Sequence, residues 1–106
     1  VLLEALEYQG IPTPGRQQPL TLASGELIHI DIAWPEFRFG VEPGSAWHHG
    51  GDLGQRRDQD RDRACAEVGW LIVRFDDAMR TDPDGAASQV AQIFRRRRSD
   101  FRNVQA

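Results

Sequence analysis

Apolar positions recur along the chain with a helical period in some stretches, and with a strand period or as short runs in others. The pattern predicts helices over 1–9, 55–68 and from 82 or 84 to about 98, and strands over 18–23, 27–34, 37–42 and 70–75. Gly10 and Gly69 follow the first two helices as stops, and either Asp82 or Asp84 can cap the third. The order contains a strand–helix–strand crossover, so we expect an α/β or α+β fold with helices packed on a mixed sheet.

The chain of 106 residues suits a single domain, which we expect over 1–98. Residues 99–106 are polar, and we expect them to form a frayed tail. The sequence starts at Val1, without methionine and already inside a helical pattern. We therefore expect it to be the C-terminal part of a longer protein.

The two central strands are predicted to form a hairpin that breaks at Pro35. A two-residue or four-residue loop there places Asp31 opposite Gly40 and gives each strand one apolar face. That face carries Ile28, Ile30, Ile32, Trp34, Phe37, Phe39 and Val41. Asp31 and Glu42 then lie on the other face as diagonal neighbours, roughly 7–8 Å apart at the backbone.

Two carboxylates at this separation can share one Mg²⁺ or Mn²⁺ ion, with water completing the coordination shell. Gly40 lies between them and has no side chain to obstruct an ion or a phosphate. The alternative is that Asp31 forms a solvated cross-strand ion pair with Arg38.

The segment 43–54 is predicted to be a loop, and it carries the adjacent histidines His48 and His49. A histidine beside a metal-bound carboxylate site can donate or accept a proton in hydrolysis. The alternative is a solvent-exposed pair without a role. His29 is a lone histidine on a strand, and we interpret it as structural.

The helix over 55–68 places Asp58, Arg61, Asp62 and Cys65 on one face, at the spacing i, i+3, i+4 and i+7. Cys65 indicates that this face meets the sheet, which would bring Asp58 and Arg61 towards Glu42. The alternative is an ordinary charged helix whose acids and arginines pair at the surface, with little effect on stability.

The composition restricts the catalytic residues and the binding partners that this chain can have. All 13 basic residues are arginine, so a catalytic lysine is excluded, and the formal net charge is −3. The run Arg95–Arg98 is either a set of cations near a helix end or a local phosphate-binding patch. No apolar stretch is long enough to span a membrane. The lone cysteine cannot form an internal disulfide, which favours a reducing compartment and a cytoplasmic location.

Four segments together resemble a known bacterial family. They are Asp31-Ile-Ala-Trp-Pro-Glu-Phe-Arg-Phe-Gly-Val-Glu42, then Trp47-His48-His49, then Asp58-x-x-Arg61-Asp62, then Gly69-Trp70-Leu-Ile-Val-Arg74-Phe75. The family comprises uncharacterised endonuclease-like domains, known as domain of unknown function five-five-nine. It is similar to the very-short-patch repair endonuclease in the PD-(D/E)xK superfamily, and the resemblance covers about 1–98.

The resemblance implies a restriction-endonuclease-like fold and Mg²⁺- or Mn²⁺-dependent hydrolysis of DNA. It makes Asp31 the central metal ligand, Glu42 the second acid, and His49, or its neighbour His48, the catalytic histidine. Asp58 and Asp62 match acid positions of the family's helix. It also implies two partners, duplex DNA and an N-terminal domain of the same protein. Arginine forks match phosphate oxygens, and the candidates for DNA contact are Arg38, Arg61, Arg95 and Arg96.

Two departures from the family pattern support a second hypothesis. Many members read Glu-x-Asp-Gly where this chain reads Glu42-Pro43-Gly44-Ser45, and the superfamily's lysine is absent. Arginine is a poor proton acceptor and does not replace that lysine. The second hypothesis is therefore a catalytically decayed module that binds DNA or a protein partner, within a regulatory or toxin–antitoxin-type protein. A weaker third hypothesis is a purely structural interaction domain.

Overall fold

The computed structural model of the protein describes residues 2–44, 52–75 and 81–105. Its elements in chain order are α1 (Leu2–Tyr8), β1 (Gly15–Thr21), β2 (Leu27–Trp34), the 3₁₀ turn η1 (Pro35–Phe37), β3 (Phe39–Pro43), α3 (Asp52–Glu67), β4 (Leu71–Phe75) and α5 (Pro83–Gln105). The predicted order of helices and strands is confirmed, and so is the fold class, an α+β fold with a mixed sheet. The strand predicted over 27–34 is confirmed residue for residue.

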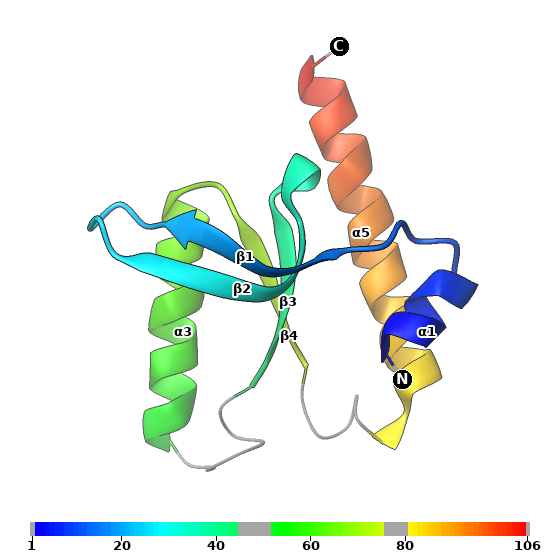
Figure 1. Ribbon diagram of the computed structural model, residues 1–106, viewed down its shortest axis with the longest axis horizontal. Helices are drawn as coiled ribbons and strands as arrows, with labels where there is room; N and C mark the ends of the chain where they lie inside the picture. Colours follow the sequence, from blue (N-terminus) through cyan, green and yellow to red (C-terminus); the bar gives the residue numbers. More distant parts are fainter. Residues whose placement is uncertain (1, 45–51, 76–80, 106) are drawn as a thin grey trace.

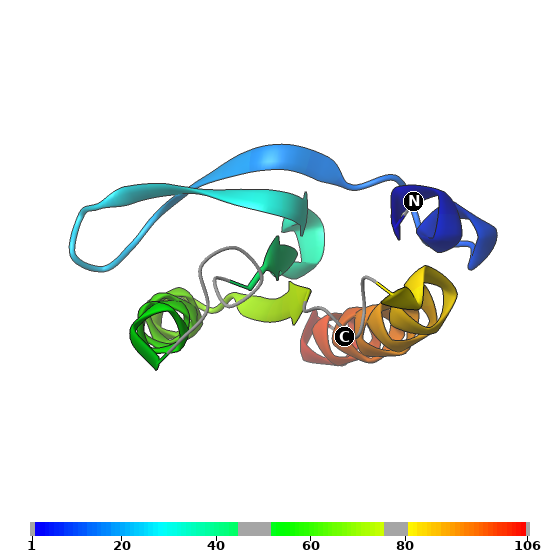
Figure 2. The ribbon, with the colours of Figure 1, turned by 90° about the horizontal axis from the view of Figure 1, so that it is seen from below.

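The four strands form one sheet in the order β1-β2-β3-β4. β2 is antiparallel to both of its neighbours, β1 and β3, whereas β3 and β4 are parallel and are connected through α3. In Figure 1 the β1–β2 ribbon runs across the direction of β3 and β4. Figure 2 shows β3 and β4 between α3 and α5, with the β1–β2 ribbon lying over them.

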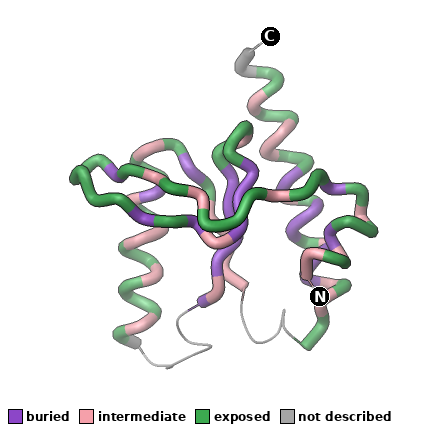
Figure 3. Tube along the Cα trace, in the orientation of Figure 1, coloured by how far each residue is buried: buried purple, intermediate pink, exposed green. Residues whose placement is uncertain are grey.

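Each face of the sheet has its own hydrophobic core. On one face, α5 and α1 pack through Phe94, Val90 and Leu6 against Trp34 and Phe39. On the other, α3 packs through Cys65 against Ile28, Ile30, Ala33 and Trp70. The buried residues accordingly gather in β2 and β3 and on the inner side of α5 (Figure 3). Burying both faces of a sheet requires helices on each side, as this architecture provides.

The alternation of apolar residues predicts that the isoleucines of β2 share one face, but they do not. Ile28 and Ile30 belong to the α3 core, whereas Ile32 and Trp34 belong to the α5 core. The β1–β2 ladder is interrupted opposite Asp31, where Gln17 has a φ of 52°. A left-handed residue in a strand bends the two-stranded ribbon locally. The even-numbered residues of β2 therefore face one core before the bend and the other core after it.

The β2–β3 register differs from the predicted one by two residues. Trp34 pairs with Phe39, Ala33 with Gly40 and Ile32 with Val41. The connection contains four residues, 35–38, because Pro35 starts a 3₁₀ turn that ends at Arg38 with a φ of 48°. The expectation that a four-residue loop would place Asp31 opposite Gly40 is therefore wrong, since two extra loop residues move the pairing by two positions. A shift of two residues keeps the parity, so Asp31 and Glu42 still share a face. If the pairing is extended by one residue beyond Ile32 and Val41, Asp31 and Glu42 become direct partners rather than diagonal neighbours.

Three other boundaries differ from the predictions. β1 begins at Gly15, three residues before the predicted strand, because Gly15 and Arg16 pair with β2. β4 begins at Leu71, one residue after the start of the predicted strand, and it lies at the edge of the described sheet with Leu71 exposed. The frayed tail predicted from Ser99 is wrong, since α5 continues to Gln105.

Contacts along the last turns of α5 explain its length. Phe101 packs edge-on against Phe37, with 6.3 Å between ring centroids. The Arg97 guanidinium lies over the Phe101 ring at 4.7 Å. Of the two candidate caps for this helix, Asp82 is the one that acts, accepting a hydrogen bond from the Gly85 N–H at 3.1 Å. Within the described ranges, no helix is long and apolar enough to cross a membrane.

Candidate functional site

The predicted carboxylate pair forms where β2 and β3 run side by side. The Asp31 backbone N–H lies 3.4 Å from Glu42 Oε1, so the two residues are adjacent. Only 6% of the Glu42 side chain is exposed, compared with 33% of that of Asp31. Glu42 is thus a nearly buried charge, which requires close partners in the protein.

Arg61 of α3 is the first partner of Glu42. It donates from Nε to Glu42 Oε2 at 3.1 Å and from Nη2 to Glu42 Oε1 at 2.9 Å. This two-point geometry is the strongest pairing that arginine makes with a carboxylate. Nη2 also donates to the backbone carbonyl of His29 at 2.9 Å, which ties α3 to β2.

Arg74 of β4 is the second partner of Glu42. Glu42 and Arg74 are direct partners in the parallel ladder, and Arg74 Nη1 lies 3.2 Å from Glu42 Oε2. The same guanidinium contacts Asp62 at 2.6 Å and Asp58 at 3.7 Å, and donates to the Pro43 carbonyl at 3.0 Å. Arg74 therefore links β3, β4 and α3.

The electrostatics hold Arg74 in its charged form. Burial lowers the pKa of the Arg74 guanidinium, but the hydrogen bond to Asp62 and the charges of Asp62, Asp58 and Glu42 raise it. The net result is a pKa above the ordinary value of arginine. Glu42 thus lies between two permanent cations.

Asp31 has different partners. Gln17 Nε2 donates to Asp31 Oδ1 at 2.9 Å, and Arg16 Nη2 lies 3.7 Å from the same oxygen. The alternative that Asp31 pairs with Arg38 is wrong, because Arg38 lies in the β2–β3 turn and not opposite Asp31. The Arg38 side chain is exposed and extends towards Gly69.

The predicted face of α3 is confirmed. Cys65 is fully buried against the sheet, and Arg61 and Asp62 one turn earlier contact Glu42 and Arg74. Burial raises the pKa of the Cys65 thiol, which disfavours the reactive thiolate. Cys65 is therefore a packing residue, and the face that it marks carries the charged cluster.

These residues line a solvent-open pocket of about 470 Å³ between β2, β3 and α3. Its walls comprise Gln17, Asp31, Glu42, Pro43, Arg57, Asp58, Arg61 and Arg74. We call it the charged pocket, and its three carboxylates are matched by its three guanidinium groups. Asp31 and Glu42 also border a smaller apolar pocket of about 220 Å³ with Leu2, Ile32, Val41, Pro43 and Phe75.

The donor set does not fit a divalent cation. Both oxygens of Glu42 accept hydrogen bonds from Arg61, and Arg74 is within 3.2 Å of one of them. A metal ion there would displace a two-point ion pair and lie beside two positive charges. Among the described residues, no group of three or more His, Cys, Asp or Glu side chains could hold a metal ion.

The space above Gly40 has a different role from the predicted one. A Cβ at Gly40 would lie 2.5 Å from Ile30 Cγ2 and 3.1 Å from Ile72 Cδ1. The side chains of Ile30 and Ile72 fill the space above Gly40, so a glycine is needed there for the packing under α3. The same packing leaves no room at Gly40 for an ion or a phosphate.

The predicted catalytic histidines, His48 and His49, lie outside the described residues. The side chain of His29, interpreted as structural, is exposed.

The arginine run at 95–98 is in the interior of α5, not at its end. Arg95 donates to the Gln9 carbonyl at 2.7 Å, and the Arg98 guanidinium lies 5.2 Å from the centroid of the Phe94 ring. Arg97 donates to the carbonyls of Phe37, Arg38 and Gly69. Arg96 is exposed and pairs with Asp100 one turn later. The run therefore mainly holds α5 to its neighbours.

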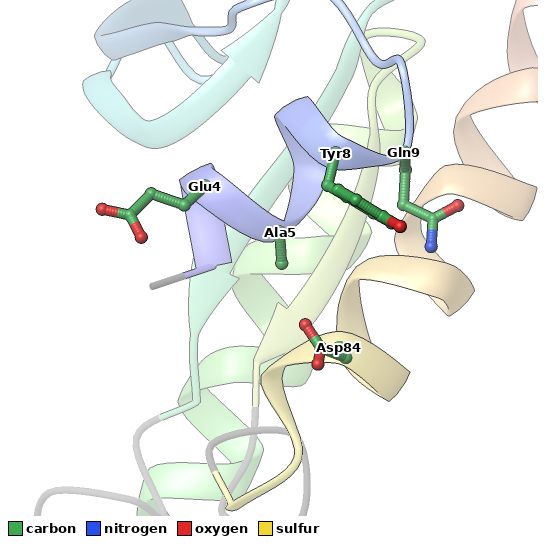
Figure 4. Close-up of a pocket in the computed structure, with 5 residues that line it drawn as sticks. All are labelled: Glu4, Ala5, Tyr8, Gln9 and Asp84. Carbon is green, nitrogen blue, oxygen red and sulfur yellow. The ribbon is translucent and has the colours of Figure 1, made fainter.

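A larger hollow of about 550 Å³ lies between α1 and the start of α5 (Figure 4). Its lining is Glu4, Ala5, Tyr8, Gln9 and Asp84. It has two carboxylates and no arginine in its walls, so it would repel phosphate. The charged pocket remains the candidate site.

Arg74 and Gln17 are the members of the cluster that sequence reasoning missed. Arg74 had a usable signal, since an arginine inside an otherwise apolar strand needs a buried acid as its partner. Gln17 had none, because its approach to Asp31 depends on the bend in β1.

Comparison with known proteins gives two relatives. No protein-family model matches the sequence, and no solved structure is detectably similar to the chain. Two uncharacterized proteins of Mycobacterium tuberculosis, one from strain CDC 1551 / Oshkosh and one from strain H37Rv, are each 34% identical to it over 90 residues. The alignment covers 84% of this chain and 33% of each relative. The chain spans about a third of the length of these curated relatives.

Proposed function

We propose that this chain is a nuclease-like module that binds duplex DNA through phosphate contacts in the charged pocket, without a resident metal ion. The observation that carries the proposal is the double engagement of Glu42 by Arg61 and Arg74. Guanidinium groups occupy the side of Glu42 where the resemblance to PD-(D/E)xK nucleases would place a cation. The decayed-site hypothesis requires this kind of arrangement.

The pocket offers arginines that a phosphate can reach. Arg57 is exposed on its rim and, within the described part of the chain, forms no ion pair. About a third of the Arg61 side chain, 36%, is exposed as well. Since the chain carries a net charge of −3, binding has to be local and strongly dependent on salt.

Metal-dependent DNA cleavage is the second candidate. It is favoured by the gathering of Asp31, Glu42 and Asp58 around one open pocket. It would require Glu42 to be released from at least one arginine. Gly44 at a position where the family often has an acid argues against it.

Two features of the proposal extend beyond the chain itself. It requires a cytoplasmic protein, because a bacterial cell keeps its DNA there. It also leaves room for a second domain of the same protein as a partner, as the resemblance implies.

Fluorescence anisotropy with a labelled DNA duplex, over a series of salt concentrations and with excess EDTA, tests the first candidate. We expect binding that weakens steeply with salt and does not change with EDTA. Absence of binding at low salt would overturn the proposal. The same duplex incubated with Mg²⁺ or Mn²⁺ tests the second candidate, which requires cleavage that Asp31→Asn abolishes.

A further inference from the structure

The two arginines that neutralise Glu42 are bound very differently. Arg74 contacts three carboxylates and a backbone carbonyl, and 20% of its side chain is exposed. Its contact with Asp62, at 2.6 Å, is shorter than its contact with Glu42, at 3.2 Å. Arg74 could leave Glu42 only by giving up contacts with β3 and α3 at the same time.

Among the residues that the structure describes, Arg61 has one acidic partner, Glu42. Its guanidinium is held by Glu42 and by one backbone carbonyl, that of His29. Its side chain is almost twice as exposed as that of Arg74 and borders the charged pocket. A small rotation of the side chain would turn this guanidinium towards solvent.

The arrangement leaves Glu42 with a partner when Arg61 departs. Burying an unpaired carboxylate is costly, and this cost normally locks such an ion pair. Here Arg74 stays within 3.2 Å of Glu42 and supplies the compensating charge. The departure of Arg61 therefore costs less than it would if Glu42 were left without a cation.

We infer that Arg61 is an exchangeable arginine, which leaves Glu42 to bind a DNA phosphate while Arg74 remains as the fixed cation of the site. The inference rests on the proposed function and assigns the phosphate contact to one residue. Arg57 lies one helical turn before Arg61 on α3 and lines the same pocket. Residues four apart on a helix share a face, so both guanidinium groups can flank one phosphate.

Three variants of the chain test the inference by anisotropy with the labelled duplex and by thermal unfolding, and a fourth, Arg74→Gln, is the reference for thermal unfolding. Arg61→Gln should weaken binding about tenfold and lower the slope of log K against log salt by about 0.9, the share of one phosphate contact. Arg61→Lys should retain most of that slope, because it keeps the charge. The matched control is Arg63→Gln on the same helix, whose side chain is 71% exposed and, within the described residues, pairs with Asp60 alone. Its binding should change less than that of Arg61→Gln, and its slope should stay nearer that of the wild type.

The outcomes separate this inference from the proposed function. If the wild-type chain binds no DNA, the proposed function fails and the inference with it. If the wild type binds and Arg61→Gln matches its affinity and salt slope, only the inference is overturned. It is also overturned if Arg61→Gln lowers the unfolding temperature as much as Arg74→Gln, since Arg61 would then be a fixed structural ion pair.

Discussion

At the scale of single residues, the site is decided by how Glu42 is neutralised. Its carboxylate is 6% exposed and receives three arginine contacts no longer than 3.2 Å. Sequence spacing brought Arg61 towards Glu42, because i, i+3 and i+4 positions share a helix face. It did not bring in Arg74, since the parallel register of β3 and β4 is not visible in a list of residues.

Arg74→Gln should lower the free energy of unfolding by about 2–4 kcal/mol, below the range for a fully buried pair because Arg74 is one-fifth exposed. The change leaves Asp62 and Asp58 without their shared cation. Urea unfolding followed by circular dichroism measures the loss. Arg63→Gln is the control and should stay within about 0.5 kcal/mol of the wild type; equal effects for both would contradict the assigned network.

Gly40→Ala should destabilise the protein by about 1–3 kcal/mol, because the added methyl group overpacks the space beneath Ile30 and Ile72. The matched control is Gly44→Ala, four residues later. A Cβ there would lie 3.7 Å from the Phe75 carbonyl, an ordinary contact. Thermal unfolding should therefore separate the two variants, and an unchanged Gly40→Ala protein would show that α3 packs less closely than described.

At the scale of elements, α5 depends on contacts with distant backbone. Arg97 donates to the carbonyls of Phe37 and Arg38 in the β2–β3 turn, and to that of Gly69 before β4. The helix could be predicted from its periodicity, but its last two turns could not. Those turns are polar in sequence and are held by Phe101 and Arg97 against the β2–β3 turn.

Arg97→Ala should cost about 1–3 kcal/mol of stability, because three carbonyl acceptors lose a charged donor. Arg96→Ala, one residue earlier, should change stability by less than about 0.5 kcal/mol, since Arg96 is 83% exposed. Chemical denaturation of the two variants tests the difference. If Arg96→Ala were the more damaging change, the assignment of the arginine run as a structural clamp would be wrong.

At the scale of the whole molecule, the described fold has two hydrophobic cores and a charged cluster whose acids have arginine partners. Ile28 and Ile30 pack under α3, whereas Ile32 and Trp34 pack under α5. The charged pocket opens between β2, β3 and α3, and its acids are matched by arginines of α3 and β4. We therefore expect the folded state of the described residues to need no bound cation.

Excess EDTA, Mg²⁺ or Mn²⁺ should therefore shift the unfolding temperature by less than about 1 °C. A ligand that binds only the folded state raises stability in proportion to the logarithm of its concentration over Kd, so a working metal site would be evident. Differential scanning fluorimetry makes the comparison. A rise with Mn²⁺ that disappears in Asp31→Asn would contradict the prediction and favour the cleavage hypothesis.

The sequence by itself determined the order of the elements, the extent of β2, the buried face of α3 and the shared face of Asp31 and Glu42. These follow from local periodicity and from the parity of a hairpin, which a shift of two residues does not change. Only the tertiary structure decided the division of β2 between two cores, the length of α5 and the partners of Glu42. Those depend on the bend at Gln17, the packing of Phe101 and the parallel pairing of Glu42 with Arg74, which join residues far apart in the chain.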